Sequence, residues 1–218
     1  MLDPIYFHFD LLSPYAAIAW SQIHALAAAH GREVRPVPTL LAALLAHGGT
    51  RGPAEIPAKR VYVFKDSLRS ARRLGVPLIP PPNHPFNPLL ALRAASMVEG
   101  EAQRRLIDQL FYGAWGGGGG VESPEAVAAL AARAGLDGER VIEAATSPEA
   151  RARLRAQTDE AIAAGVFGVP TMRVDGELFW GYDSFAHLDA FLGGHDTITA
   201  EDLQPWLHIQ PSATRRGL

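Results

Sequence analysis

The sequence predicts an α/β protein in which two short β-containing halves flank a large all-helical insertion. A strand, a helix and a second strand fit residues 5–38, whereas the next strand signals appear only after residue 170. The stretches between them have helical patterns. With 218 residues, of which 48% are apolar, the chain is long enough to bury a full hydrophobic core.

The first half reads as a βαβ unit. Residues 5–9 are β-branched and aromatic, and residues 14–30 form an alanine-rich helix that Gly31 ends. Residues 33–38 can form a second strand. Such a unit predicts a right-handed parallel crossover.

The second half reads as a ββα unit. Strands at 171–174 and 178–180 are separated by Asp175-Gly176-Glu177, a tight hairpin turn, and residues 183–192 have the pattern of a closing helix. Residues 77–88 form a proline-rich extended linker, and residues 116–120 a flexible glycine loop. Helices are expected at 53–74, 88–100, 101–112, 123–134, 138–145 and 147–164.

These segments suggest three parts. We expect a discontinuous core from residues 1–38 and 165–195, a helical insertion at 39–164, and a polar, loosely attached tail at 196–218. The chain shows neither a signal sequence nor an apolar stretch of membrane-spanning length, so we expect a cytoplasmic protein with no membrane partner.

Composition excludes several functional classes. The chain has no cysteine, which removes disulfides, thiolate metal sites and a catalytic thiol. Its net charge is −3 and its basic residues are scattered, so we expect no nucleic acid partner. The eight histidines lack metal-ligand spacing, and no Gly-x-Ser-x-Gly motif supports a hydrolase triad. We therefore predict no metal.

Ser13 is the leading catalytic candidate. It directly precedes Pro14 at the start of the first helix, where free amides and the helix dipole favour a bound anion such as a thiolate. Helix capping alone could explain it, because Ser123 and Ser147 also precede prolines at helix starts. Only Ser13 follows a strand, which brings it to a sheet edge where α/β folds bind ligands.

A second candidate is the segment Gly165-Val-Phe-Gly-Val-Pro-Thr171. It can be a helix C-cap followed by a strand. Alternatively, it is a cis-proline loop in which the backbone of Val169 pairs with an extended peptide-like ligand. We predict that the Val169–Pro170 bond is cis.

Two charged residues have both a structural and a functional interpretation. Asp183 can cap the last helix or bind an ammonium group of a ligand. Lys59 lies on a long amphipathic helix, where lysines are usually only solvated.

Taken together, these motifs resemble the 2-hydroxychromene-2-carboxylate isomerase family, whose members are DsbA-like proteins related to kappa-class glutathione transferases. The resemblance covers about residues 4–193. It rests on Phe7-His-Phe-Asp-Leu-Leu-Ser-Pro-Tyr15, Pro53-Ala-Glu-Ile-Pro-Ala-Lys-Arg60, Pro85-Phe-Asn-Pro88, the 165–171 segment and Phe179-Trp-Gly-Tyr-Asp183.

The resemblance implies a thioredoxin-like fold that binds glutathione, with Ser13 as the catalytic serine that stabilises its thiolate. It implies a homodimer acting on a small aromatic substrate. The other implied glutathione contacts are Tyr15, Lys59, Val169, Pro170, Tyr182 and Asp183, and Thr50, Phe86 and Asn87 would line the substrate pocket.

The resemblance also has gaps. Where many family members have a lysine and an asparagine, this chain has Ala46 and Thr50, so a partner for a substrate carboxylate is lost. The sequence therefore favours a glutathione-dependent cis/trans isomerase. A kappa-class-like transferase or peroxidase, or a redox-inert thioredoxin-like binding protein, is the alternative.

Overall fold

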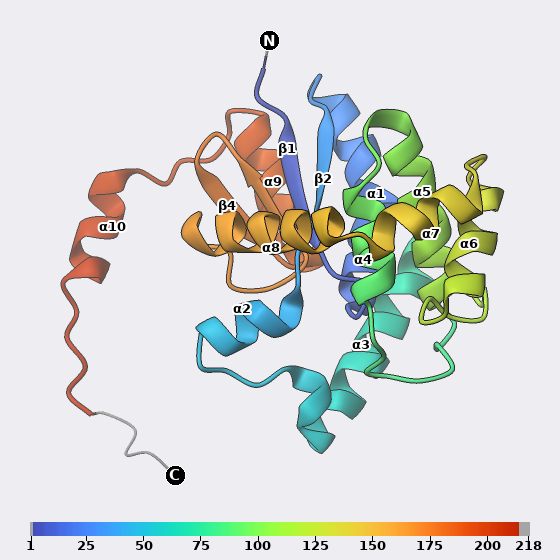
Figure 1. The fold of residues 1–218 in the computed structure, drawn as a ribbon. Helices are drawn as coiled ribbons and strands as arrows, with labels where there is room; N and C mark the ends of the chain where they lie inside the picture. The colour runs from blue at the N-terminus through green and yellow to red at the C-terminus, as the bar shows by residue number, and fades with distance from the viewer. Residues whose placement is uncertain (1, 214–218) are drawn as a thin grey trace.

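The computed structural model describes residues 2–213 and is built around a four-stranded mixed sheet of order β2-β1-β3-β4 (Figure 1). β2 runs parallel to β1, and β3 and β4 follow as an antiparallel pair. The predicted βαβ and ββα halves are confirmed and join where β1 pairs with β3. The strands are β1 (Ile5–Phe9), β2 (Val34–Pro38), β3 (Thr171–Val174) and β4 (Glu177–Trp180).

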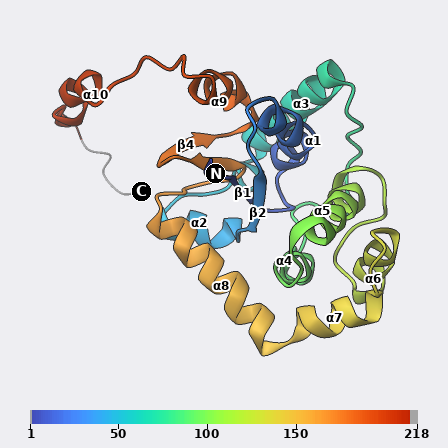
Figure 2. The same ribbon diagram turned by 90° about the horizontal axis from the view of Figure 1, so that it is seen from above.

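Helices cover both faces of this sheet. Figure 2 shows α1 (Pro14–Ala29), α3 (Pro57–Leu74) and α9 (Phe185–Leu192) on one side, with α2 (Leu41–His47) and α8 (Pro148–Ala163) on the other. The remaining insertion helices lie beside the sheet: α4 (Leu89–Ser96), α5 (Gly100–Trp115), α6 (Pro124–Arg133) and α7 (Gly138–Thr146). Within residues 2–213, no helix is both long and apolar enough to cross a membrane.

The central strand anchors the core. β1 is covered on both faces, which explains its nearly continuous apolar sequence. The rings of Phe7 and Phe9 pack against Trp20 of α1, with Phe9 also 5.6 Å from Phe111 of α5 between ring centroids. A single buried cluster therefore runs from the sheet into the insertion helices. The boundaries of the three proposed parts stay a prediction.

Two helical segments differ from the prediction. The helix expected at 53–74 is a 3-10 turn (Pro53–Glu55) followed by α3, because Ile56 precedes Pro57 and is extended, with φ −115°. The α2 helix was not predicted. It has no side-chain N-cap and only seven residues, and tertiary packing of Leu44 near α8 stabilises it.

The tail contains structure that the sequence pattern did not predict. Residues 200–207 form α10 (Ala200–Leu207), capped by Thr199, at the end of an extended segment that leads away from the body (Figure 1). Its apolar side chains are exposed, including Trp206 at 71%. The description of this tail as polar was therefore wrong for these residues, and residues 214–218 lie outside the described part.

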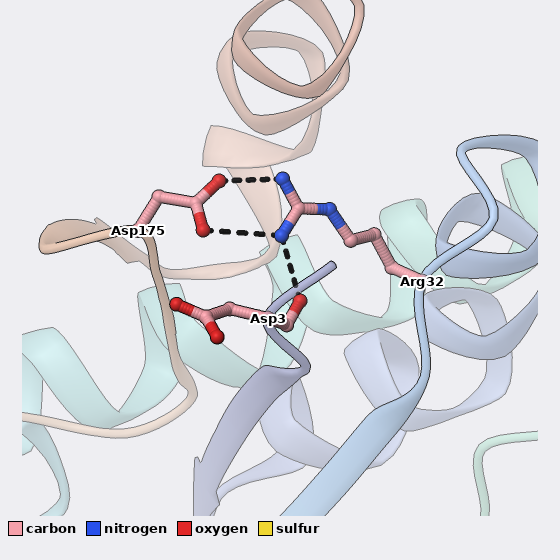
Figure 3. A network of polar contacts seen from close by, with 3 residues as sticks. All are labelled: Asp3, Arg32 and Asp175. Carbon is pink, nitrogen blue, oxygen red and sulfur yellow. Dashed lines mark hydrogen bonds and ion pairs between the residues drawn. The ribbon is translucent and has the colours of Figure 1, made fainter. Parts of the chain in front are cut away.

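The predicted hairpin turn is confirmed and is held by an arginine. Asp175 has φ +50° and is followed by Gly176, as a tight turn between two strands requires. Figure 3 shows the guanidinium of Arg32 pairing with both carboxylate oxygens of Asp175 while also donating to the carbonyl oxygen of Asp3 at 2.7 Å. This bidentate contact ties the β3–β4 turn to the start of the chain.

Candidate functional site

Ser13 caps α1 and is buried. Its Oγ accepts a hydrogen bond from the amide of Ala16 at 3.1 Å, and Pro14 occupies the first helical position. The side chain is 7% exposed. The same hydroxyl donates to the carbonyl oxygen of Val169 at 3.5 Å. Residues 156 positions apart in the sequence thus meet at the positive end of a helix.

The Val169–Pro170 peptide bond is cis, as predicted. Sheet register explains why this loop meets Ser13. Thr171 starts β3 and pairs with His8 near the end of β1, so the loop before Thr171 lies beside the turn that follows β1. The amide of Val169 has no hydrogen-bond partner among residues 2–213. A peptide-like ligand can therefore pair with it.

Tyr182 and Asp183 are joined to this loop through Gly181. The amide of Gly181 donates to the Pro170 carbonyl at 2.9 Å, and the positive φ of Gly181 (+86°) turns the chain into a short 3-10 helix, Tyr182–Ser184. The Tyr182 hydroxyl is 3.5 Å from a guanidinium nitrogen of Arg73 on α3. Asp183 is exposed, and Ser184 takes the N-cap position of α9. The capping interpretation of Asp183 was therefore wrong.

Asp10 is a site residue that sequence reasoning missed. It is fully buried, and its carboxylate accepts hydrogen bonds from the amides of Leu12 at 3.0 Å and Leu41 at 2.9 Å. Burial raises the pKa of Asp10 from 3.8 to about 6, although these amide donors oppose the shift. Asp10 thereby joins the turn before Ser13 to the start of α2. A carboxylate directly after a buried strand was the available signal.

His84 hydrogen-bonds to the same turn, at the carbonyl oxygen of Leu12, whereas Asp10 accepts from the Leu12 amide. Its Nε2 lies 3.0 Å from the carbonyl oxygen of Leu12, so Nε2 must carry the proton that is donated. Burial lowers the pKa of His84 and favours the neutral ring. Its ring packs among Phe64, Phe86 and Trp115. No sequence pattern indicated this contact, because 72 positions separate His84 from Leu12.

Tyr15 and Lys59 are not held against Ser13 in the way that Val169 is. The hydroxyl of Tyr15 donates to a carboxylate oxygen of Asp66 on α3 at 2.8 Å, and burial together with this carboxylate raises its pKa. The hydroxyl is thus already used to hold α1 against α3. Lys59 lies in the first turn of α3 and is exposed. Among residues 2–213, no hydrogen bond joins it to Ser13.

The three predicted substrate contacts occupy different environments. Phe86 is 8% exposed and belongs to the main core. The Asn87 side chain accepts from the amide of Leu89, so it supports the start of α4. Thr50 is exposed between α2 and α3. Among residues 2–213, no hydrogen bond joins these three residues to Ser13, so their role in substrate binding stays a prediction.

This geometry favours chemistry on a ligand anion. The hydroxyl of Ser13, the first-turn amides of α1 and the helix dipole converge where a negative sulfur or oxygen would be stabilised. Because the chain has no cysteine, a reacting sulfur must come from the ligand. The backbone of Val169 adjoins that point, and Gly181, which is hydrogen-bonded to Pro170, precedes Tyr182 and Asp183 in the chain.

Comparisons with known proteins agree with this fold. The family model of the DSBA-like thioredoxin domain matches residues 4–193. A 2-hydroxychromene-2-carboxylate isomerase from Pseudomonas putida is 30% identical over 189 residues, covering 86% of this chain and 93% of that protein. Another, from Sphingobium xenophagum, is 30% identical over 198 residues, covering 88% and 99%. Human glutathione S-transferase kappa 1 is 22% identical over 200 residues, covering 85% and 88%.

Solved structures show the same relation. The structure of a 2-hydroxychromene-2-carboxylate isomerase superposes with a TM-score of 0.80 at 29% identity, covering 87% of this chain and 94% of that one. A cytosolic disulfide reductase, DsbM from Pseudomonas aeruginosa, has a TM-score of 0.59 at 19% identity over 88% of this chain and 99% of that chain. The second likeness concerns the fold alone.

Proposed function

We propose that this chain, which belongs to the DSBA-like thioredoxin family and within it to the family of 2-hydroxychromene-2-carboxylate isomerases, is a glutathione-dependent cis/trans isomerase. The substrate would be a conjugated aromatic compound of the 2-hydroxychromene-2-carboxylate type. The contact between the Ser13 hydroxyl and the Val169 carbonyl, at 3.5 Å, carries the proposal. It brings a thiolate-stabilising helix start within reach of a backbone segment that can bind a peptide.

The residues present fit a tripeptide with charged ends. The amide of Val169 is free to pair with the cysteinyl backbone, and Pro170 fixes the loop shape. Asp183 would receive the γ-glutamyl ammonium, with Tyr182 beside it, while Lys59 would reach a carboxylate of glutathione or of the substrate. Tyr15 would contribute its ring, because its hydroxyl is engaged by Asp66.

Glutathione supplies, when bound, a nucleophilic thiolate that can add to a conjugated double bond, allow rotation and leave again. On binding, the Ser13 hydroxyl would turn from the Val169 carbonyl and donate its hydrogen bond to that sulfur, and the first-turn amides of α1 would favour the charged form. Asp10 and His84 would keep the turn that carries Ser13 in place from two sides.

The acceptor part of the site differs from the family pattern. Ala46 and Thr50 stand where many relatives have a lysine and an asparagine. We therefore propose that Thr50, Phe86 and Asn87 line the substrate pocket, in which the substrate carboxylate lacks the lysine partner that the family resemblance implies. A homodimer and a cytoplasmic location stay predictions.

The decisive experiment has two arms. Calorimetric titration of glutathione into the parent protein should show binding, and isomerisation of 2-hydroxychromene-2-carboxylate should require added glutathione. Absence of binding would contradict the proposal and leave a thioredoxin-like binding protein as the alternative. Binding with conjugate formation in place of isomerised product would favour the transferase alternative, which the kappa-class relatives support at lower identity.

A further inference from the structure

One pocket of the molecule has none of the residues assigned to glutathione in its lining. It has a volume of about 510 Å³ and is lined by residues of α2, α4 and α8 together with Leu40, which precedes α2. This volume is within the usual range for small-molecule sites. Its lining residues are Leu40, Ala43, Leu89, Arg93, Arg151, Leu154, Arg155, Thr158 and Asp159.

The charge of this pocket is opposite to that of the whole chain. The lining contains three guanidinium groups, on Arg93, Arg151 and Arg155, and one carboxylate, that of Asp159, whereas the chain has a net charge of −3. Among residues 2–213, none of these arginines forms an ion pair. Such a concentration of unpaired cations attracts an anion.

Arg93 supplies the most specific observation. Its Nε is buried and has no hydrogen-bond partner among residues 2–213. A buried donor on a charged group is costly when it is left without an acceptor, and in native structures such a group calls for a bound partner. Because Nε itself is closed off from solvent, a carboxylate in the pocket would accept from the two terminal nitrogens of this guanidinium.

The α8 sequence explains the arrangement on the other wall. Arg151 and Arg155 are four positions apart and therefore share one face of the helix. Arg153, between them, turns away and pairs with Glu99. Thr158 is already satisfied, because its hydroxyl donates to the Leu154 carbonyl and accepts from the Leu40 amide. Arg151 donates to the Thr146 carbonyl at 3.4 Å, so among residues 2–213 the free polar groups of the lining are the guanidinium groups of Arg93 and Arg155 and the carboxylate of Asp159, which together leave a net positive charge.

The rest of the lining is apolar. Leu40, Ala43, Leu89 and Leu154 provide a hydrocarbon surface that inorganic phosphate would not use. We propose that this pocket binds a small organic carboxylate with an apolar body about the size of one or two rings. The apolar body would lie against the leucines, and the carboxylate would pair with Arg93 and Arg155. This proposal does not rest on glutathione chemistry.

The test uses 2-naphthoate as the probe in calorimetric titrations with the full chain. The parent should bind it, and Arg155→Gln and Arg93→Gln should each weaken binding at least tenfold. Arg153→Gln is the matched control, because it removes the same charge from the same helix outside the pocket; its affinity should stay within twofold. Arg155 is exposed, so this variant keeps the test valid even where Arg93→Gln lowers the melting temperature.

The following results would overturn the proposal. Absence of naphthoate binding by the parent, or equal affinity in Arg155→Gln, would overturn the site. Binding of inorganic phosphate or of uncharged 2-naphthalenemethanol as tightly as naphthoate would overturn the assigned ligand class. Ser13→Ala should bind naphthoate like the parent; loss of binding in that variant would place the ligand in the Ser13 site, and so would displacement by glutathione.

Discussion

The helix starts at Ser13 and Ser147 have the same local chemistry in different surroundings. Each serine precedes a proline, and each Oγ accepts from the amide three residues later at 3.1 Å. Ser13 is buried beside the Val169 carbonyl, whereas the Ser147 side chain forms only the hydrogen bond that caps its own helix, among residues 2–213. A cap motif thus becomes a candidate site only when a distant segment packs against it.

The difference comes from what precedes each helix. Ser13 follows β1, whose partner β3 brings the 165–170 loop alongside. Ser147 connects α7 to α8 near the surface, with no strand before it. The same hydroxyl and the same helix dipole are present in both places. Four predictions separate the local contribution from the tertiary one.

The largest effect is expected from replacing the two serines. Ser13→Ala and Ser147→Ala should each lose about 1 kcal/mol of stability, because each removes one N-cap. Only Ser13→Ala should lower glutathione-dependent turnover, by about 10²- to 10³-fold, the typical loss for a donor to a developing or bound anion. Urea unfolding and steady-state rates measure the two quantities. Equal turnover in both variants would remove Ser13 from the chemistry.

The buried turn before Ser13 should also respond to pH. Burial raises the pKa of Asp10 from 3.8 to about 6, and burial, with a smaller contribution from Arg173, lowers the pKa of His8 from 6.5 to about 4. Between pH 4 and pH 6 the folded state holds a proton at Asp10 that the unfolded chain has released. The Asp10 contribution to stability therefore falls as pH rises, while that of His8 increases.

Asp10→Asn removes the titrating group whose contribution to the unfolding free energy falls as pH rises. From pH 4 to pH 6, the unfolding free energy of the variant should rise by about 2 kcal/mol more than that of the parent, which is the part of the Asp10 shift that falls within this pH range. Any constant loss from the altered hydrogen bonds to Leu12 and Leu41 shifts the whole curve and leaves its slope unchanged. Urea titrations at pH 4, 5 and 6 give the slopes. Parallel curves for parent and variant would contradict this account.

A smaller effect is expected at the far end of the proposed ligand. Asp183→Asn should weaken glutathione binding about tenfold, because it removes the charge that faces an ammonium group, and the melting temperature should hardly change at this exposed residue. Asp196→Asn is the control, since it removes an exposed carboxylate after α9. Calorimetry that gives the same dissociation constant for both variants would exclude Asp183 from the site.

The smallest effect concerns the second residue of each helix. The Tyr15 hydroxyl of α1 donates a hydrogen bond to Asp66 of α3, whereas Glu149, at the same position after Ser147, is exposed. Tyr15→Phe should cost about 1 kcal/mol, the typical net value of one hydrogen bond, and change glutathione affinity less than twofold. Glu149→Gln should leave stability within about 0.5 kcal/mol. A tenfold weaker affinity in Tyr15→Phe would give its hydroxyl a direct role.

Local sequence was sufficient for the elements that local interactions stabilise. The strand at Ile5–Phe9, the Ser13-Pro14 helix start and the Asp175-Gly176 turn each depend on neighbouring residues, and each is present in the structure. The motifs around Ser13 and Pro170 also indicated a shared site, and sheet register does bring them together. The prediction worked here because the same residues set both the local conformation and the strand pairing.

Tertiary structure alone decided the remaining features. Asp10 and His84 meet the same turn, Arg93 and Arg155 line the same pocket, and α2 exists despite its weak cap. Apart from the position of Asp10 directly after a buried strand, no sequence pattern marks these features, because their contacts do not repeat at helix or strand spacing. Their energies come from burial, charge and packing between distant segments, which exist only once the chain has folded.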